Sequence, residues 1–589
     1  SSPTGVRTVF NTALCAVLAG AGFLALSSRR AGFARFVGGV IVALTVGDQS
    51  GISPEQWQRF AKTAVVHLVS ISGLHVTMLA GLAAAITGWL WRRIPGLVSR
   101  FSALRAALVA GVVTALGYTA LAGMAVPTQR TLFMLMTVAW CLWRARPAAI
   151  SAVWAFCLAV VVLIDPFSVL SVGFWLSFLT VGVLLWVGGN RMAAGPKWQS
   201  WVLAQYAATL GSMPILLAVF GQLPLASPLA NAVAIPVVGM LVTPLALAGL
   251  LDPSGYLLQA SAQVLAWVDV FLQWCAAWTW AQISFVPPPM WTILPAGVGV
   301  LLLLAPRGLP GRWLGPLLLL PLFVLRPAAL PFGTYRATVL DVGQGLSVLV
   351  ETRNSSLLFD TGVASNAERV ILPALRAAGR FHLDRLVLSH NDTDHMGGAE
   401  ILLAGLPIRH IQHGLPGDLP WLVPFARRQS CLAGQTWHVD GVDFRLLWPP
   451  EGFASKQDNA NSCVLLIDNG RHRMLIPADL GGVEELRLIA SGLPTAEILV
   501  AGHHGGKGSS SQALIDALKP QFAVFSVGYR NHFGHPRQDT LARFTAAGAR
   551  NLRTDQSGAL IFDVGETIAL TQWRLRRKRY WHLTLHQEE

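Results

Sequence analysis

The chain has 589 residues, of which 53% are hydrophobic and 13% are charged, and its formal net charge is +14 at pH 7. Soluble domains carry about 25% charged residues. This composition excludes an ordinary soluble protein and predicts an integral membrane protein.

The charge divides the chain into two parts. Residues 1–330 contain 18 Lys or Arg and 5 Asp or Glu, whereas residues 331–589 contain 26 and 25. We expect a transmembrane domain over 1–330 and a soluble domain over 331–589. The basic excess of the first part is typical of segments that flank transmembrane helices. An anionic cargo, nucleic acid included, is the functional alternative.

Apolar runs fill the first part. A helix needs about 20 apolar residues to cross a bilayer, and some runs are short or interrupted, so we expect a polytopic helical bundle with about nine to eleven spans. The sequence begins SSPTG without a methionine, and we expect a fragment or a processed chain. The candidate runs lie near 8–26, 36–47, 62–91, 106–124, 131–143, 147–164, 166–188, 200–220, 224–251, 254–280, 291–305 and 313–325.

Polar residues interrupt the run HLVSISGLHVTMLAGL at 67–82. Serine and glycine allow a helix to break or another helix to approach, and irregular backbone at membrane depth is tolerated only against protein or water. Packing alone explains a single residue of this kind, but two histidines around a Ser-Gly pair favour the lining of a cavity. The candidate lining residues are His67, Ser70, Ser72, Gly73 and His75.

An arginine interrupts a later run. The thirteen residues between Arg130 and Arg144 make a helix of about 20 Å, which is shorter than the hydrocarbon core. Either one arginine extends to the membrane surface, or Arg130 lies within the bundle and faces water. An arginine at the bilayer centre costs about 2.5–3.5 kcal/mol, so one retained there indicates function. Asn231 and Asp269 raise the same question more weakly.

The second part alternates strand and helix patterns. Apolar runs typical of strands begin with TYRATVLDVGQGLSVLVET at 334–352 and recur as far as ALIFDVG at 559–565. Helical patterns such as 367–380 lie between several of them, which predicts a single α/β domain. Cys431 and Cys463 lie in this domain and could pair, but two cysteines do not make a disulfide framework, and the compartment stays open.

A group of potential metal ligands follows a predicted strand in LSHNDTDHMGGAE at 388–400. Its members are His390, Asp392, Asp394 and His395. A turn after a strand can direct alternate side chains at one ion, and His with carboxylate ligands suits divalent cations. Further candidates stand at the ends of other predicted strands: Asp360, Asp479, His503, His504, His532 and His535.

These motifs carry a resemblance. HxDxDH at 390–395, PAD at 477–479 and HHGG at 503–506 resemble the metallo-β-lactamase superfamily, whose fold is an αββα sandwich with a one- or two-metal site. The usual opening of that superfamily is HxHxDH, and Asp392 replaces its second histidine. DVGQG at 341–345 and GHP at 534–536 resemble one branch, the C-terminal domain of the ComEC competence channel.

Motifs of the first part are similar to the membrane domain of the same family. They are GDQSGISPEQWQRF at 47–60, PTQR at 127–130, DPFSVLSVGFWLSF at 165–178 and SPLANAVAIP at 227–236. Relatives usually carry a small OB-like domain ahead of the first of these motifs, and no such domain is recognised here. Its absence fits a truncated chain or a lineage without it.

The resemblance implies a function. The chain would be a multi-pass channel of the bacterial inner membrane that takes up single-stranded DNA during natural transformation. The metal domain, on the outer face, would be a nuclease that degrades the strand that is not transported. Implied partners are the lipid bilayer, duplex DNA at entry, a periplasmic DNA receptor and a cytoplasmic helicase-like motor; the oligomeric state stays open.

The resemblance also implies roles for the candidate ligands. His390 and Asp392 would hold a first metal and Asp394 and His395 a second, with Mn²⁺ or Zn²⁺ as the ion. Asp479 would bridge the metals, His504 or His535 would complete the shell, and Asp394 and His395 would be catalytic. Further residues of the motifs and their surroundings would support the site: Asp341, Gln344, Asp360, Asn461, His503 and His532.

Two alternatives remain. DNANSC at 458–463 stands where relatives supply a histidine, so the first metal would be weakly held or absent. A catalytically inactive domain that only binds DNA is therefore one alternative. The other is a membrane-anchored hydrolase of small or lipid phosphoesters, although so many spans exceed what an anchor needs. The basic tail RLRRKRY at 574–580 would contact DNA or form a solvated edge.

Overall fold

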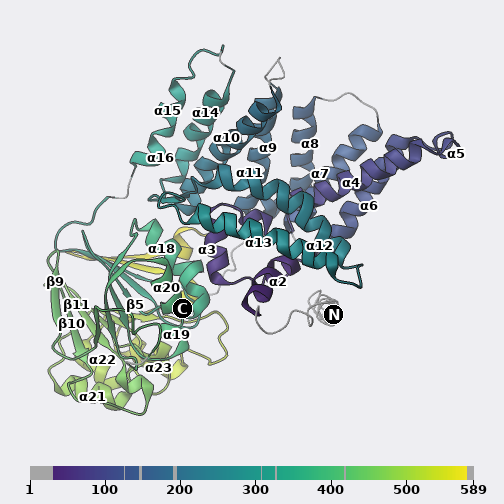
Figure 1. Ribbon diagram of the computed structural model, residues 1–589. Coiled ribbons are helices and arrows are strands. Elements are labelled where there is room, and N and C mark those ends of the chain that lie inside the picture. The colour runs from purple at the N-terminus through teal and green to yellow at the C-terminus, as the bar shows by residue number, and fades with distance from the viewer. Residues whose placement is uncertain are drawn as a thin grey trace. The chain divides into compact units, whose positions relative to one another are not determined.

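The computed structural model describes residues 31–69, 71–124, 126–144, 149–189, 196–306, 308–325, 328–416 and 419–579. The chain divides into two compact units, an N-terminal unit of residues 1–325 and a C-terminal unit of residues 326–589 (Figure 1). The apolar run at 8–26, the candidate lining residue Ser70 and the last residue of the basic tail, Tyr580, lie outside the described residues.

The N-terminal unit is built from helices. Five described segments are long and apolar enough to cross a membrane: Gly73–Arg92, Ala103–Leu121, Val172–Gly189, Trp198–Phe220 and Ser227–Gly249. Shorter apolar helices lie at Ile150–Ile164, Met290–Leu304 and Leu314–Val324. The chain therefore has the membrane helices that its composition predicts, while the expected number of spans stays a prediction.

The helices of this unit have the following bounds: α2 Ala31–Thr45, α3 Pro54–Lys62, η1 Val66–Leu68, α4 Gly73–Arg92, α5 Pro95–Val98, α6 Ala103–Leu121, α7 Val126–Trp143, α8 Ile150–Ile164, η2 Pro166–Leu170, α9 Val172–Gly189, α10 Lys197–Ile215, η3 Leu216–Phe220, α11 Ser227–Val237, η4 Val238–Val242, α12 Thr243–Gly249, α13 Tyr256–Ala276, η5 Met290–Thr292, α14 Ile293–Leu304, α15 Leu314–Leu319 and α16 Pro321–Val324. Two short strands, β1 Gln222–Leu223 and β2 Ile283–Ser284, pair with each other.

Prolines distort two of the long apolar segments. Pro214 lies in α10 and is followed by the π-helical turn η3, and Pro236 lies in α11 and is followed by the π-helical turn η4. A proline removes a backbone donor and displaces the preceding turn, and π-bulges accommodate such a change. Leu217 and Val242 in these turns are fully buried. One side of each irregular turn thus lies against protein, the surroundings in which such backbone is tolerated at membrane depth.

The C-terminal unit contains two β-sheets. The eight-stranded sheet has the order β17-β16-β3-β4-β5-β6-β7-β8, and the seven-stranded sheet has the order β15-β14-β13-β12-β11-β10-β9. The strands are β3 Tyr335–Val339, β4 Val348–Glu351, β5 Ser356–Phe359, β6 Leu383–Leu388, β7 Ile408–His413, β8 Arg428–Ser430, β9 Thr436–Val439, β10 Val442–Trp448, β11 Val464–Asp468, β12 Arg473–Ile476, β13 Ile498–Val500, β14 Phe522–Phe525, β15 Arg550–Arg553, β16 Leu560–Val564 and β17 Ile568–Gln572.

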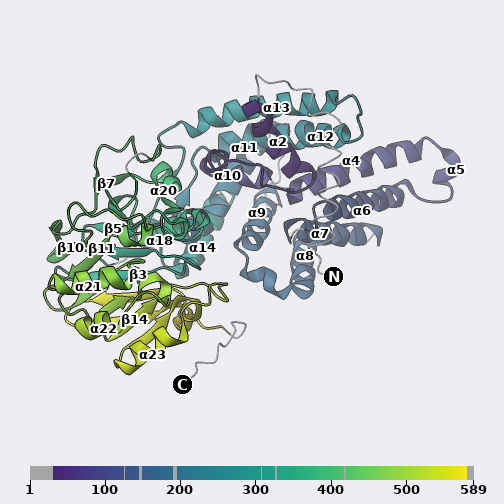
Figure 2. The same cartoon turned by 90° about the horizontal axis from the view of Figure 1, so that it is seen from below.

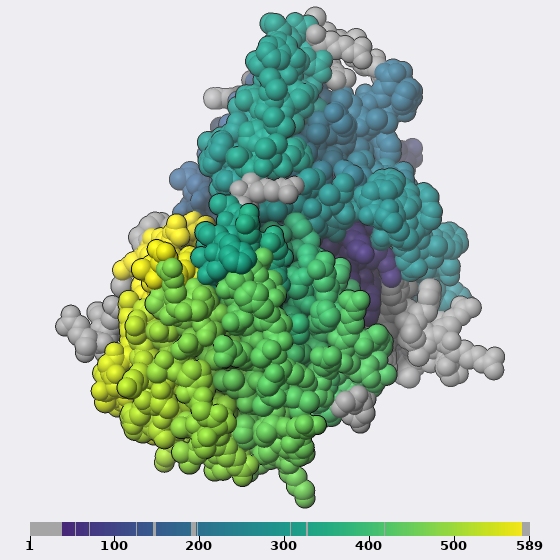
Figure 3. All heavy atoms as spheres, turned by 90° about the vertical axis from the view of Figure 1, so that its left-hand side faces the viewer, coloured from purple at the N-terminus to yellow at the C-terminus, as the bar shows by residue number. Residues whose placement is uncertain are grey.

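Helices cover the outer face of each sheet. Figure 2 shows α18 (Leu372–Ala377) and α20 (Ala399–Gly405) on one side and α21 (Gly482–Ala490), α22 (Gln512–Leu518) and α23 (Gln538–Ala546) on the other. In the space-filling view the C-terminal unit, green to yellow, is one continuous body (Figure 3). Short helical segments complete it: α17 Ala364–Asn366, η6 Ala367–Ile371, α19 Thr393–Met396, η7 Asp458–Asn461, η8 Gly502–Gly505, α24 Thr554–Ser557 and α25 Trp573–Arg576.

Strand alternation explains the four layers. In β11, Leu465 and Ile467 point to a core shared by both sheets, whereas Val464 and Leu466 pack with α21 and α22. Successive side chains of a strand point to opposite faces, so each strand that is apolar throughout serves two hydrophobic layers. The predicted αββα sandwich is confirmed.

A disulfide joins the two sheets. Cys431 follows β8 of the eight-stranded sheet, Cys463 precedes β11 of the seven-stranded sheet, and the two are bonded. The pairing that the sequence left open therefore forms, and it holds the sheets together directly beside Ser462.

Candidate metal centre

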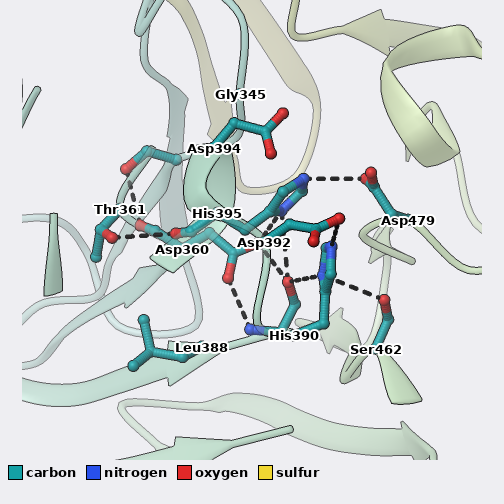
Figure 4. A network of polar contacts seen from close by, with 12 residues as sticks. Gly345, Asp360, Thr361, Leu388, His390, Asp392, Asp394, His395, Ser462 and Asp479 are labelled. Carbon is teal, nitrogen blue, oxygen red and sulfur yellow. Dashed lines mark hydrogen bonds and ion pairs between the residues drawn. The ribbon is translucent and has the colours of Figure 1, made fainter. Parts of the chain in front are cut away.

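Parallel strands bring the candidate ligands to one edge of the sandwich. β5 and β6 run parallel, as do β12, β13 and β14. Asp360 follows β5, the loop from Ser389 follows β6, Asp479 lies beyond β12 and His504 lies beyond β13. Because the carboxyl ends of parallel strands meet at the same edge of a sheet, residues separated by more than 100 positions come together (Figure 4).

Four side-chain atoms converge at this edge. His395 Nε2 lies 3.2 Å from Asp479 Oδ1 and 3.2 Å from His504 Nε2. Asp394 Oδ2 lies 3.3 Å from His504 Nε2. Donors held about 2.1 Å from a tetrahedral Zn²⁺ lie about 3.4 Å from one another. The ligand atoms of Asp394, His395 and His504 all lie within 4.8 Å of one another, a spacing that fits a divalent cation.

Hydrogen bonds fix the orientation of both imidazoles. His504 Nδ1 lies 2.9 Å from the Ser526 carbonyl oxygen, which only accepts, so Nδ1 carries the hydrogen and Nε2 presents a lone pair. His395 Nδ1 donates to Asp360 Oδ2 over 2.8 Å. Both Nε2 atoms thus lie near Asp479, and that of His504 also lies near Asp394. Imidazole nitrogens and carboxylate oxygens grouped in this way fit a divalent metal.

A second group of three potential ligands overlaps the first. Among the described residues, His390, His395 and Asp479 also lie close enough to hold an ion. However, His395 Nδ1 is committed to Asp360, so its Nε2 serves one ion only. The two groups therefore share the same His395 nitrogen. On the other side of His390, Ser462 Oγ of the DNANSC stretch lies 3.4 Å from Nδ1.

Asp360 holds this arrangement in place. Its carboxylate is fully buried and accepts from the Ser389 backbone N–H and from the Ser389 hydroxyl, each over 2.7 Å, besides His395. Such outer carboxylates fix the ring orientation of metal-binding histidines. Asp360 has φ +58°, and His503 and His504 have φ +49° and +55°. Strained backbone of this kind clusters at functional sites.

The DVGQG motif supports the Asp394 loop from behind. Leu346 N–H donates to the Asp394 carbonyl over 3.1 Å. A Cβ on Gly345, which has φ +130°, would lie 2.4 Å from that carbonyl oxygen, so only glycine fits. Gln344 accepts weakly from the Gly528 N–H at 3.4 Å, and Asp341 pairs with Arg574 at 2.8 Å. Part of the basic tail is therefore an ion-pair partner of this motif.

The remaining predicted residues lie around the centre. Asp392 keeps 46% of its side chain exposed and approaches His390 Nε2 at 3.3 Å, and neither group of potential ligands includes it or His535. The His535 ring is 5.8 Å from that of His503 and 6.4 Å from that of His504. His532 is exposed, and Asn461 bonds to the backbone of Ser455 instead of to the site.

Burial and charge set the protonation of the buried histidines. Burial lowers the pKa of His390, and the neighbouring His395 adds to this effect. Burial also acts to lower the pKa of His395, but Asp479 and Asp360 outweigh it and hold that pKa well above the ordinary value. A proton on His395 Nε2 therefore occupies the position that a cation would take, and metal binding should release it.

Sequence reasoning missed the residues that orient the ligands. Ser389 lies 2.9 Å from His390 Nδ1 and links it to Asp360, and Thr361 donates to the His395 carbonyl over 3.0 Å. The Ser526 carbonyl fixes His504. Ser389 and Thr361 stand directly beside motif residues, which was the available signal; a backbone carbonyl leaves no signal in a sequence.

Four candidate lining residues of the N-terminal unit have local roles. Ser72 is the N-cap of α4, and the His75 ring accepts from the Ser72 N–H over 3.3 Å. A Cβ on Gly73 would lie 2.2 Å from Thr131 Oγ1 of α7, so glycine allows the two helices to cross closely. The segment that contains Ser72, Gly73 and His75 thus begins α4 and allows α4 to pack closely against α7. His67 bonds to the Ala64 carbonyl over 3.0 Å.

Asn231 and Arg130 are buried in the same unit. Asn231 donates to Ser227 Oγ over 2.9 Å. Arg130 is only 7% exposed, and its Nε and Nη1 atoms have no hydrogen-bond acceptor among the described residues.

Comparison with known proteins identifies the family. The profile of the family described as "Competence protein" matches residues 44–310, and that of the "Metallo-beta-lactamase superfamily" matches residues 340–529. The chain is 42% identical to Competence protein ComA of Neisseria gonorrhoeae over 92% of its own length and 77% of that protein. The chain belongs to the ComEC family of competence proteins.

Other ComEC-family relatives are more distant. Identity is 29% to Recombination protein 2 of Haemophilus influenzae, over 86% of this chain and 69% of that protein. Identity is 30% to ComE operon protein 3 of Bacillus subtilis, over 89% of this chain and 71% of that protein. The solved structure of a mutant CmlA beta-hydroxylase aligns with a TM-score of 0.30 and 15% identity, over 49% of this chain and 65% of that one. The Rm3 metallo-beta-lactamase aligns with a TM-score of 0.21 and 18% identity, over 30% of this chain and 77% of that one.

Membership of this family supports a role in DNA uptake, with DNA as the substrate, for a multi-pass membrane protein. The metallo-β-lactamase domain supports divalent metal binding and a metal-dependent hydrolase in general.

Proposed function

We propose that the N-terminal unit is an inner-membrane channel for single-stranded DNA and that the C-terminal unit is a metal-dependent deoxyribonuclease that degrades the other strand. The observation that carries the nuclease proposal is the meeting of four side chains: Asp394, His395, Asp479 and His504. Each of them lies 3.2–3.3 Å from at least one of the others. An inactive DNA-binding domain would not need to keep four acceptor atoms together at this electrostatic cost.

The residues of the centre divide the work of phosphodiester cleavage. Asp394, His395, Asp479 and His504 would hold Zn²⁺ or Mn²⁺, which when bound polarises a phosphate oxygen and activates water. The attacking water forms a new P–O bond and gives up a proton, the P–O bond to the leaving oxygen breaks, and that oxygen takes a proton up. His503, with 44% of its side chain exposed, and His535, whose ring lies 5.8 Å from that of His503, would accept and supply these protons.

A direct assay tests the nuclease. The full-length protein in detergent should cleave end-labelled single-stranded or duplex DNA when Mn²⁺ or Zn²⁺ is added, and a chelator should stop the reaction. If neither ion supports cleavage while the protein still binds DNA, the alternative of an inactive binding domain holds. Cleavage of lipid or small phosphoesters in preference to DNA would instead favour the anchored hydrolase.

The channel proposal is supported by Arg130 of α7. A Cβ on Gly173, in the first turn of α9, would lie 3.5 Å from Arg130 Nη2. The guanidinium therefore lies against a helix N-terminus, which is itself a positive end. Among the described residues no carboxylate forms an ion pair with Arg130, although the charge of Asp165 acts on it. Two positive groups side by side favour an anion between them, and phosphates of a passing strand supply one.

Replacing Arg130 by glutamine is expected to lower DNA uptake at least about tenfold, because a hydrogen bond to a charged group contributes about 1.5–3 kcal/mol. Transformation frequency, normalised to the amount of protein in the membrane, measures the effect. Arg144→Gln is the matched control, since Arg144 ends the same apolar run but is exposed beside Trp140. Equal losses in both variants would show that Arg130 has no special role in transport.

The disulfide supports an outer location for the C-terminal unit. Disulfides persist in oxidising compartments such as the periplasm and are rare in the cytosol, and Cys431 and Cys463 are bonded. When cells are lysed under denaturing conditions, we expect these two cysteines to resist alkylation until a reductant is added. Cys141, Cys157 and Cys275 are free thiols and should react at once. Reaction of all these thiols without reductant would place the unit in the cytosol.

The external partners follow from the same proposal. A channel that receives duplex DNA outside and passes one strand inward needs a DNA receptor on the periplasmic side. It also needs a helicase-like motor on the cytoplasmic side, because the sequence contains no GxxxxGK[ST] phosphate-binding loop of its own.

A further inference from the structure

We propose that residues 529–537 form a stacking lip, a rigid surface beside the metal centre that holds an unpaired nucleobase of the DNA substrate. This inference rests on the proposed nuclease function and deepens it, since it assigns the substrate of that centre as a single strand. The sequence of the lip is YRNHFGHPR.

Exposed aromatic rings mark the lip. Tyr529 is 50% exposed and Phe533 is 46% exposed. Among the described residues of the C-terminal unit, the other large aromatic side chains exposed to this degree are Phe332 and Trp573. An apolar ring in water contributes nothing to the folded core, so two such rings within five positions indicate a binding surface.

A ladder of rings connects the lip to the metal centre. The Phe533 ring lies 5.8 Å from the His535 ring at an interplanar angle of 24°, and the His535 ring lies 6.4 Å from the His504 ring at 25°. His504 is one of the four converging residues. The His532 ring, which is exposed, lies 3.8 Å from the Phe533 ring at 37° and continues the series outward, so a nucleobase stacked on the exposed rings of the lip extends it. The phosphodiester of a neighbouring nucleotide then lies toward the metal centre.

Exposed basic residues lie in the lip and at the neighbouring HHGG turn, where a Cβ on Gly506 would lie 3.5 Å from His535 Nε2. Arg530, Arg537 and Lys507 are all exposed, and Arg530 lies over the Tyr529 ring at 5.3 Å. The lip itself contains no acidic residue. Aromatic faces that stack bases, combined with cations that neutralise the backbone, are the features by which proteins bind single strands without reading their sequence.

Hydrogen bonds make the lip rigid before any ligand binds. Asn531 Nδ2 donates to the Gly528 carbonyl over 3.0 Å and to the His535 carbonyl over 2.7 Å, and its Oδ1 accepts from the His535 N–H over 2.9 Å. One side chain thus ties both ends of the loop together. A surface ordered in advance loses little conformational entropy when a base stacks on it.

The structure of duplex DNA sets the specificity. A paired base is already stacked between its neighbours and has no free face to offer Phe533. The lip should therefore engage single strands and frayed ends, with little preference for sequence because every base has a π face.

Photo-crosslinking tests the inference on the full-length protein. A single-stranded oligonucleotide carrying 5-iododeoxyuridine is bound to the protein and then irradiated. A chelator is present, so the oligonucleotide stays intact and the readout does not depend on cleavage. Trypsin cuts after Arg530 and Arg537, and the crosslink is expected on the fragment NHFGHPR. The same base in a duplex should give little crosslink there.

Variants separate stacking from proximity. Phe533→Ala should lower the yield on this fragment at least about fivefold, the smallest effect expected for one stacked base, and Phe533→Trp should retain it. Phe332→Ala is the matched control, because Phe332 is exposed but lies away from the metal centre. It contacts Gly441, directly before β10, whereas the opposite end of β10 pairs with β11 near Ser462. Crosslinks found only elsewhere, or an unchanged yield in Phe533→Ala, would overturn the stacking lip while DNA binding stands. Absence of any crosslink would overturn the lip together with DNA binding by this chain.

Discussion

The Asp394→Ala chain is expected to lose metal-dependent cleavage of DNA by more than about a hundredfold. Loss of a residue that only supports a metal ligand costs about 10–100-fold in affinity or activity, and Asp394 is placed to contact the ion itself. Its Oδ2 lies 3.3 Å from His504 Nε2. Burial acts to raise the pKa of Asp394, but the hydrogen bond to His504 and the charges of His395 and His504 outweigh it, so the net pKa is lowered and the group binds as a carboxylate.

The assay compares initial rates on labelled single-stranded DNA at saturating Mn²⁺ or Zn²⁺. Asp443→Ala is the matched control, because Asp443 also pairs with a histidine, His438, at 2.7 Å but does so on the surface. The control should cleave at the rate of the unchanged chain. If Asp394→Ala cleaves as fast as the control, the metal centre described above does not perform the chemistry.

Transformation assays on the same variants separate the two units. A channel that needs only DNA binding from its C-terminal unit would keep uptake when Asp394 is replaced, whereas a channel that must degrade one strand to admit the other would lose it. The comparison with Arg130→Gln then shows whether transport and cleavage fail independently.

The Asp360→Ala chain is expected to lose about 3–5 kcal/mol of stability in the C-terminal unit, the usual effect of breaking a buried charged pair. The substitution leaves the Ser389 N–H, the Ser389 hydroxyl and His395 Nδ1 buried without their acceptor. Each unsatisfied buried group costs about 1–3 kcal/mol. Metal affinity should fall as well, since nothing then fixes the His395 ring.

Hydrogen exchange measured by mass spectrometry checks this expectation. Peptides from β5 and β6 should exchange at least about a hundredfold faster in the variant, since each 1.4 kcal/mol is a factor of about ten. Asp563→Ala is the control: Asp563 pairs with Arg336 at 2.6 Å, but about 40% of each side chain is exposed, and such surface pairs contribute about 0–1 kcal/mol. Exchange that is equal in both variants would contradict the role assigned to Asp360.

The departures from the family motif lie together in this chain. Asp392, at the second histidine of HxHxDH, lies 3.3 Å from His390 Nε2, and Ser462, in the DNANSC stretch, lies 3.4 Å from His390 Nδ1. Both changes therefore fall around His390, while Asp394, His395 and His504 lie close enough together to hold an ion.

The two-part architecture, the family and the identity of most candidate ligands could be predicted from the order of residues alone. Composition separated the membrane unit from the soluble one because lipid and water select different side chains. HxDxDH, PAD and HHGG were readable because each lies in a short turn directly after an apolar strand, and such turns are specified by local residues.

Which of those ligands meet depends on the packing of the folded chain. Asp360 and the loop from Ser389 to His395 belong to the eight-stranded sheet, whereas Asp479 and His504 belong to the seven-stranded sheet. Their distances depend on how the two sheets pack, and packing is a property of the whole core. The same holds for Ser526, which acts through a carbonyl, and for Phe533, whose exposure and alignment with His535 and His504 arise from the fold and leave no trace in the order of residues.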